Sequence, residues 1–382
     1  MAKALYIHIP FCNEICNYCD FPKVYSSVQK TDEYLNSLLG ELKLYEKTIG
    51  FAHIETIYIG GGTPTVLSTM ELGILFFYLR IKIDFSRLKE VSIEANPESL
   101  NDPEKIACLK RNGVTRVSLG VQTFSEKHLN FLQRSHSKEE VLEVIQLLNE
   151  QDFEINLDLI YAIPTQTLKE WEEDLDIALS LPITHVSAYS LILEENTKLY
   201  LDYQRKKVEL VNNEIEAQMF ETVIDRLTAA GFEHYEISNF TKGNRSFHNE
   251  IYWKTEPYIG IGLGAHGYLG MTKERRIRYG NTRSITAYKE HLSKPELPVV
   301  DVHDLTEAEQ LEEAMFLGLR MMEGVDLHSL SFKFGINVYK IYRSKIVKLQ
   351  ELAYVSYEAG KLKLTKKGLM MANDVFEEFL VD

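Results

Sequence analysis

Short runs of β-branched and apolar residues alternate with longer amphipathic stretches over the first two thirds of the chain. In the first long stretch, Leu35, Leu38, Leu39 and Leu42 recur at the spacing of one helix face. The short runs predict strands at residues 4–9, 54–60, 90–95, 116–121, 154–160 and 185–192. The stretches between them predict helices at residues 31–48, 68–79, 103–112, 138–150 and 168–181. Strand–helix units in series predict an α/β fold with a parallel sheet, and a partial (β/α)6 barrel fits this pattern best.

The pattern changes towards the carboxyl end of the chain. A helix at residues 212–230 ends before Gly231, which suits a helix C-cap. Beyond it, the pattern predicts helices at residues 306–321, 341–352 and 367–380, and a hairpin at 354–365 that turns at Ala359 and Gly360. We therefore expect a barrel domain over residues 1–235, a connecting segment over 236–300, and a small winged-helix-like α+β domain over 301–382.

Chemistry in a parallel sheet lies at the carboxyl ends of the strands. Cys12 follows the first predicted strand, and Gly60, Gly61 and Gly62 follow the second. Asn96 and Pro97 follow the third strand, and Gln122 follows the fourth. The sequence therefore predicts a functional site at this edge.

Cys12, Cys16 and Cys19 stand at a spacing that can wrap one side of a four-iron–four-sulfur cluster. Three thiolates leave one iron open, and S-adenosylmethionine can chelate that iron through its amino and carboxylate groups. A zinc site and three unrelated thiols are the alternatives, but a structural zinc site needs four ligands. Cys108 lies on a predicted helix far from this motif, and we interpret it as a buried helix residue.

Composition narrows the classes of partner. The formal net charge of −14 argues against nonspecific binding to nucleic acid or to anionic membranes, which needs a positive surface. No apolar run reaches the roughly 18 residues of a membrane span. The first residues do not have the pattern of a signal peptide. We therefore expect no transmembrane segment and a cytoplasmic protein.

Several motifs resemble the oxygen-independent coproporphyrinogen oxidase family of radical S-adenosylmethionine proteins. In chain order they are LYIHIPFCNEICNYCDF (5–21), IGGGTPT (59–65), SIEANPE (92–98), SLGVQTF (118–124), LDLIYAIPTQT (157–167) and HVSAYSLILEENT (185–197). Each motif alone has low specificity, whereas the set in this order is highly specific.

The resemblance implies a binding site for S-adenosylmethionine beside the cluster. It assigns to that site the residues Tyr6, Tyr18, Gly61, Gly62, Thr63, Glu94, Gln122, Arg134, Asp158 and Ile192. Glu94 suits the ligand's ammonium, Arg134 its carboxylate and Asp158 its ribose hydroxyls. The alternatives are a tight strand–helix turn at the glycines, a surface carboxylate at Glu94 and core positions for the tyrosines.

Two branches of this family differ in class. One is an enzyme that decarboxylates two propionates of coproporphyrinogen III, and the other is a heme chaperone of the HemW type. The resemblance implies that the enzymes carry a further cysteine two residues beyond the third, where this chain has Phe21. It also implies a longer segment before the cluster motif in the enzymes. Both features favour the chaperone branch.

A second motif, His248-Asn249-x-x-Tyr252-Trp253, resembles the chaperone branch and implies heme binding there. A histidine can ligate heme iron, and Tyr252 and Trp253 offer flat apolar surface. His266, in a glycine-rich run, is a second candidate ligand. The alternative for both histidines is a hydrogen-bonded structural role.

A basic run at residues 273–278 suits porphyrin propionates, although a solvated loop is the simpler interpretation. The resemblance thus implies three cofactors or ligands: a 4Fe–4S cluster, S-adenosylmethionine, and heme or another porphyrin. It also implies that heme passes to an acceptor protein, which the sequence does not identify.

Overall fold

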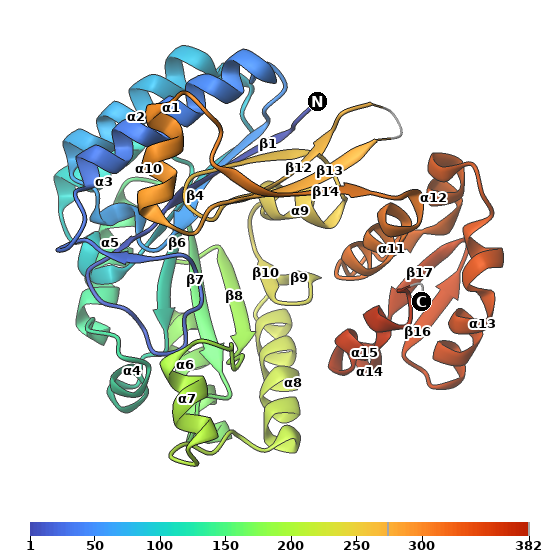
Figure 1. Cartoon of the computed structure of the whole chain (residues 1–382). Coiled ribbons are helices and arrows are strands. Elements are labelled where there is room, and N and C mark those ends of the chain that lie inside the picture. The colour runs from blue at the N-terminus through green and yellow to red at the C-terminus, as the bar shows by residue number, and fades with distance from the viewer. Residues whose placement is uncertain (273–274, 381–382) are drawn as a thin grey trace.

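The computed structural model describes residues 1–272 and 275–380, and its centre is a curved parallel sheet (Figure 1). Six strands pair side by side in chain order, as the sequence predicts. They are β1 (Ala4–Ile9), β4 (Thr56–Gly61), β5 (Glu90–Ala95), β6 (Arg116–Gln122), β7 (Glu154–Tyr161) and β8 (His185–Ser190). Each predicted strand lies within two residues of the observed one. The α/β partial barrel is confirmed.

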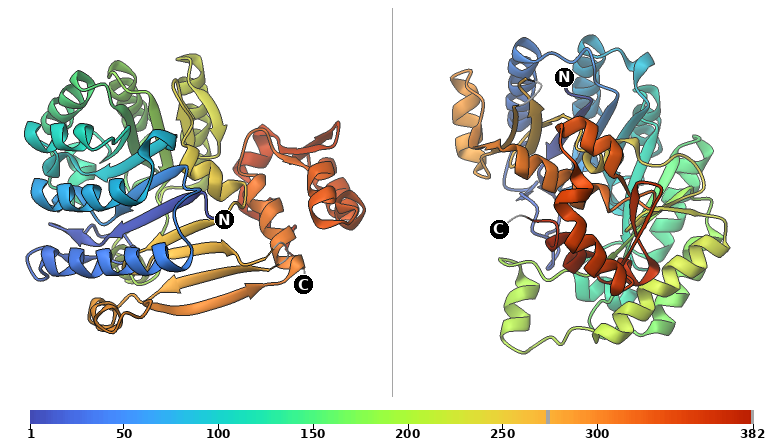
Figure 2. Two further views of the ribbon diagram at one scale, coloured as in Figure 1. Left: turned by 90° about the horizontal axis from the view of Figure 1, so that it is seen from above. Right: turned by 90° about the vertical axis from the view of Figure 1, so that its right-hand side faces the viewer.

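Helices cover the outer face of the sheet (Figure 2). They are α1 (Thr31–Thr48), α2 (Thr69–Lys82), α3 (Pro103–Arg111), α5 (Lys138–Glu150), α6 (Leu168–Ser180) and α8 (Asn213–Ala229), with the shorter α4 (Glu126–Leu132) and α7 (Lys198–Gln204). Helix α2 begins at Ser68, whose side chain and that of Glu71 cap each other's backbone N–H groups. Such a box also begins α5 and α6, which explains why the predicted starts of these helices are accurate.

The two faces of the sheet differ in chemistry. Ile57 and Ile59 of β4 are fully buried in the core that the strands form with the outer helices. The inner face is polar: Ser118 donates to Asp158 at 2.8 Å, and Asn156 donates to Ser118 at 2.7 Å. Apolar branched side chains usually fill the inside of such a barrel. The polar interior therefore indicates a barrel built to hold a ligand.

The segment 236–300 extends the sheet at both edges, so it is more than a connection. It contributes β10 (Asn239–Thr241), β11 (Tyr258–Ile261), β12 (His266–Gly270), β13 (Arg276–Asn281) and the start of β14 (Val299–Leu305), while β9 (Glu233–Glu236) forms the outermost strand beside β10. It also contains the helices α9 (Phe247–Trp253) and α10 (Ile285–Ser293). Strand β11 runs parallel to β1, and the next three strands are antiparallel.

The sequence pattern missed β11, β12 and β13 because each contains glycine, which weakens a strand pattern. Gly260 is required where it stands, since a Cβ atom there would lie 1.8 Å from the backbone oxygen of His266. The three-part division of the chain stays a prediction.

The carboxyl-terminal part has its own hydrophobic core and lies beside the barrel (Figures 1 and 2). Its elements are α11 (Glu307–Gly318), β15 (Val325–Asp326), α12 (Leu327–Phe334), α13 (Val338–Glu351), β16 (Val355–Glu358), β17 (Lys361–Leu364), α14 (Lys366–Met370) and α15 (Ala372–Glu377). The predicted hairpin is confirmed. The single closing helix is wrong, because the chain breaks at Met371 into two short helices, and α12 was not predicted. Among the described residues, no helix has both the length and the apolar character for a membrane span.

A buried carboxylate joins α1 to the added strands. Glu41 accepts hydrogen bonds from the N–H of Gly262 at 2.9 Å, from the side chain of Asn281 at 2.7 Å and from the hydroxyl of Tyr288 at 2.6 Å. Burial raises the pKa of Glu41 from 4.5 to about 7. The turn after β11 is therefore fixed by a carboxyl group whose ionisation is costly.

We predict that Glu41 makes the fold less stable as pH rises from about 4.5 to about 7. In that window the unfolded chain has lost this proton and the folded chain retains it, so folding takes up a proton. Urea unfolding of wild type and Glu41→Gln at several pH values measures the effect. The stability of wild type relative to the variant should fall with pH by at most about 1.4 kcal/mol per pH unit. A constant difference would contradict the prediction.

Candidate functional site

The cysteine motif forms a loop at the carboxyl end of β1. Cys12 lies in the short strand β2 (Phe11–Cys12) and is buried, whereas Cys16 and Cys19 follow in the loop and are partly exposed. The parallel pairing of β2 with β3 (Val24–Tyr25) closes the loop, with backbone hydrogen bonds of 2.8 and 2.9 Å at its base. The fold therefore puts all three thiols on one closed loop above the barrel.

The donor set suits an iron–sulfur cluster. Burial raises the pKa of the Cys12 thiol to about 11 and also raises that of Cys19. The guanidinium of Arg134 lies 3.6 Å from the sulfur of Cys16, and the hydroxyl of Thr63 lies 3.9 Å from that of Cys12. Within residues 1–272 and 275–380, no three cysteine, histidine or acidic side chains are already gathered as a metal site. The three thiols thus fit the cluster by their chemistry and by their position on one loop, but they are not already arranged around a metal position.

The glycine turn after β4 lies against this loop. A Cβ atom on Gly62 would stand 2.9 Å from the sulfur of Cys12, and one on Gly60 would stand 2.9 Å from the carboxylate of Glu94. Gly61 has a φ of 121° and donates its N–H to Glu94 at 2.9 Å. Only glycine leaves room here, so the turn brings Gly61, Gly62 and Thr63 together beside the cysteines as predicted.

Glu94 is a half-buried carboxylate at the end of β5. It accepts a hydrogen bond of 2.8 Å from the hydroxyl of Tyr58, in addition to that from Gly61. Burial raises the pKa of Glu94 to about 7. A ligand ammonium beside it would favour the ionised form and so gain an ion pair. The interpretation of Glu94 as an exposed surface carboxylate therefore does not fit its position.

His8 is a site residue that the sequence analysis missed. Its Nε2 lies 2.8 Å from the carbonyl of Pro22, which can only accept, so Nε2 carries the proton. The Nδ1 atom therefore accepts from the hydroxyl of Tyr6 at 2.9 Å. Tyr6 and His8 alternate on one face of β1 directly before the cluster loop, and that alternation is the signal that could have identified His8.

The next group of predicted site residues comes from β6, β7 and the chain between them: Gln122 ends β6, Arg134 follows α4, and Asp158 lies within β7. Arg134 donates to the carbonyl of Gly120 at 2.6 Å and to Asn96 at 2.8 Å, and its buried Nε has no hydrogen-bond partner in the described part of the chain. Gln122 has a φ of 67° and stands at a bulge of β6. Both oxygens of Asp158 accept hydrogen bonds, and burial raises the pKa of this group. These residues share the edge with the cluster loop.

The two remaining predicted S-adenosylmethionine residues lie in different surroundings. Tyr18, in the cluster loop, packs against a small buried group around Leu132 and Ile163. Ile192 follows β8 and is 65% exposed. Their roles at the ligand stay predictions.

His248 lies at the opposite end of the barrel. It is fully buried, and its ring nitrogens bond to the hydroxyl of Thr56 at 2.8 Å and to that of Tyr252 at 2.7 Å. Burial lowers the pKa of His248 to about 3, so the ring is neutral. An iron ligand would have to displace one of these bonds. The geometry fits the alternative interpretation, a hydrogen-bonded structural histidine.

The motif around His248 closes the amino end of the barrel. The N–H of Phe247 donates to Glu90 at 2.8 Å, and Arg116 donates to the carbonyl of Asn244 at 2.9 Å. Trp253 faces the carboxyl-terminal part, where the guanidinium of Arg320 lies 4.3 Å from its ring centre. Helix α9 therefore joins the barrel floor to that part of the chain.

His266 is the more accessible of the two candidate heme histidines. It is exposed at the start of β12, after the glycine turn that packs on the cluster loop: a Cβ atom on Gly264 would stand 2.4 Å from Pro22. His266 and His248 thus lie at opposite ends of the barrel, and the fold does not bring them together.

Comparisons with known proteins agree with this arrangement. The model described as the radical SAM superfamily matches residues 6–178, and that of the HemN C-terminal domain matches residues 305–371. The heme chaperone HemW of Bacillus subtilis is 41% identical over 99% of both chains. The protein of the same name from Lactococcus lactis is 39% identical over 100% of this chain and 98% of its own.

The structure of the coproporphyrinogen III oxidase HemN of Escherichia coli aligns with a TM-score of 0.84 at 20% identity, covering 99% of this chain and 90% of that one. At this identity the likeness shows the fold alone. The chain belongs to the family of radical SAM proteins that includes the heme chaperones HemW. Radical SAM proteins use a 4Fe–4S cluster and S-adenosylmethionine, which the cysteine loop and the glycine turn suit.

We predict that Cys12→Ser, Cys16→Ser and Cys19→Ser each lose most of the cluster, because an alkoxyl oxygen is a poor replacement for a thiolate on iron. Cys108→Ser is the matched control, since Cys108 is buried on α3 and contacts Asn112 instead of the loop. Iron and sulfide per chain after anaerobic reconstitution measure the outcome. Equal loss in the control would contradict the assignment.

We also predict that Glu94→Gln weakens binding of S-adenosylmethionine by about tenfold, since it removes a charge-assisted contact. Glu46→Gln is the control: Glu46 also accepts a tyrosine hydroxyl, but it lies on the outer helix α1. Calorimetric titration of the reconstituted protein measures the affinity, and iron content checks that the cluster is intact. Unchanged affinity in Glu94→Gln would remove this residue from the site.

Proposed function

We propose that this chain is a heme chaperone, which binds heme and hands it to an acceptor protein. The observation that carries the proposal is the similarity to the Bacillus subtilis protein named heme chaperone HemW, at 41% identity over 99% of both chains. Similarity over this length includes the cysteine loop, the segment around His248 and the carboxyl-terminal part. The function therefore rests on the whole chain and not on the cluster motif alone.

In this proposal, Cys12, Cys16 and Cys19 hold the cluster and leave one iron for S-adenosylmethionine. Glu94 and Arg134 hold the ammonium and the carboxylate of that molecule, and Asp158 holds its ribose. The orphaned Nε of Arg134 and the close approach of Gly62 to Cys12 support this placement. Bound to the cluster, S-adenosylmethionine supplies a source of a carbon radical; the chain orients it and shields it from water.

Phe21 supports the chaperone function over the alternative, an enzyme that decarboxylates coproporphyrinogen III. It stands where the resemblance implies a further cysteine in the enzymes, and its side chain is 64% exposed beside the cluster loop. An apolar ring there offers surface and no thiol chemistry. We place the protein in the cytoplasm, because reducing conditions there keep clustered thiols free for a metal.

The test is anaerobic. We predict that the reconstituted chain binds heme, passes it to a heme-free acceptor, and forms little or no protoporphyrinogen from coproporphyrinogen III. Absorption spectroscopy follows the transfer, and product analysis with reductant and S-adenosylmethionine follows the decarboxylation. The coproporphyrinogen III oxidase HemN of Escherichia coli serves as the positive control for decarboxylation. Rapid formation of protoporphyrinogen, or absence of heme binding, would overturn the proposal.

A further inference from the structure

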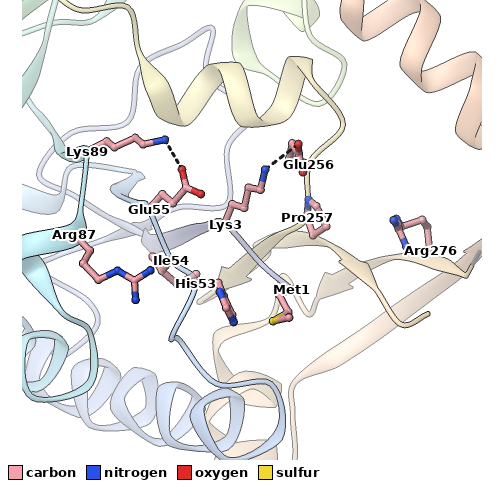
Figure 3. Close-up of a pocket in the computed structure, with 10 residues that line it drawn as sticks. All are labelled: Met1, Lys3, His53, Ile54, Glu55, Arg87, Lys89, Glu256, Pro257 and Arg276. Carbon is pink, nitrogen blue, oxygen red and sulfur yellow. Dashed lines mark hydrogen bonds and ion pairs between the residues drawn. The ribbon is translucent and has the colours of Figure 1, made fainter. Parts of the chain in front are cut away.

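A cavity of about 550 Å³ opens at the amino end of β1 and β4, away from the cluster loop (Figure 3). Four of its lining side chains are cationic: Lys3, Arg87, Lys89 and Arg276. This concentration stands out in a chain whose formal net charge is −14. Ile54 and Pro257 contribute apolar wall. The volume lies within the roughly 300–1,000 Å³ of small-molecule sites.

Two of the cations are neutralised within the cavity. Lys3 pairs with Glu256 at 3.0 Å, and Lys89 pairs with Glu55 at 2.6 Å (Figure 3). Neither arginine has a carboxylate partner among the described residues. Arg87 makes one long contact of 3.5 Å to a backbone carbonyl, and Arg276 donates to a backbone carbonyl at 2.6 Å. The cavity therefore holds two guanidinium groups without a counter-charge.

The basic run of the sequence analysis divides at this cavity. Lys273 and Glu274 lie outside the described residues. Arg275 pairs with Asp304 at 2.7 and 2.8 Å, and Arg278 pairs with Glu313 at 2.5 Å. Of the three described arginines, Arg276 alone lines the cavity. The basic run therefore does not act as a unit: it is not a single binding surface for propionates, and it is not a single solvated loop.

The cavity adjoins the segment that resembles the chaperone branch. Pro257 stands shortly after α9, which ends at Trp253, and its carbonyl accepts the N–H of Lys3 at 2.8 Å. Helix α9 therefore leads from His248 and Trp253 into the cavity wall. Through α9, this segment can therefore affect a ligand in the cavity even though His248 does not bond to that ligand.

We propose that this cavity receives the propionates of a porphyrin, with Arg87 and Arg276 as their partners. Guanidinium groups suit carboxylates because their paired N–H donors match the two oxygens. The apolar wall suits the adjoining ring. This site rests on the proposed heme-chaperone function and assigns the part of the molecule that recognises the carboxylates.

The test is heme titration of the reconstituted full chain, followed by absorption. Arg87→Gln and Arg276→Gln should each weaken binding by about tenfold, the effect of losing one charge-assisted contact. Arg275→Gln is the matched control, because it removes a neighbouring charge that Asp304 already neutralises. Iron content and circular dichroism of each variant check that cluster and fold are intact.

A second titration uses heme dimethyl ester, which lacks both carboxylate charges. The wild type should bind the ester more weakly than heme, and the two arginine variants should bind the ester as the wild type does. This pair of measurements separates a direct contact from a general change of the protein.

The possible failures are distinct. A wild-type chain that does not bind heme would overturn the chaperone proposal. Heme binding that is unchanged in both arginine variants would overturn the cavity alone. Loss of binding in His266→Ala with no loss in the arginine variants would also overturn it, since the heme would then lie at the carboxyl edge.

Discussion

The cluster loop depends on a short relay of hydrogen bonds from β1. The hydroxyl of Tyr6 donates to His8, and His8 donates to the carbonyl of Pro22 at the far side of the loop. Burial lowers the pKa of His8 to about 4, which keeps the ring neutral and its tautomer fixed. Gly61 must lack a side chain because a Cβ atom would stand 2.6 Å from this ring. The thiols, the glycine turn and β1 therefore depend on one another for their positions.

The polar inner face is the second constraint. Three hydrogen bonds, from Ser118 to Asp158, from Asn156 to Ser118 and from Asn156 to Ser187, join neighbouring strands, so the network fixes register as well as chemistry. At the amino end, Arg116 pairs with Glu154 at 2.7 Å and holds the segment before α9. A barrel with this interior gains specificity from satisfied polar groups, while its stability comes from the apolar outer face.

The sequence predicted the barrel well because its strands alternate in polarity and its helices begin with strong caps. Cys12 and Gly62 follow from strand ends, since parallel strands put their carboxyl ends at one edge. Glu94 and Asp158 followed from the family resemblance instead. His8 was missed because its contact with Pro22, fourteen residues away, leaves no mark in the sequence; only its alternation with Tyr6 along β1 pointed to it.

The outer strands and the cavity were beyond a local analysis for a related reason. Strand β11 is recognisable only through its pairing with β1, more than 250 residues earlier in the chain. The basic run contains three described arginines that look alike in sequence. Only the long-range partners of two of them, Asp304 for Arg275 and Glu313 for Arg278, distinguish these two from Arg276. Acidic side chains distant in sequence therefore determine which of these arginines is left for a ligand.

Strand β1 has the cluster loop at one end and the cationic cavity at the other. Its six residues, at about 3.3 Å each, make a rigid spacer of roughly 20 Å. In the proposed arrangement, this spacer separates a porphyrin in the cavity from the cluster at the other end of the strand. The same strand is paired on both sides, with β11 and with β4, and this pairing holds it in place. The proposed cargo site and the cluster loop are therefore kept apart by a strand that belongs to both.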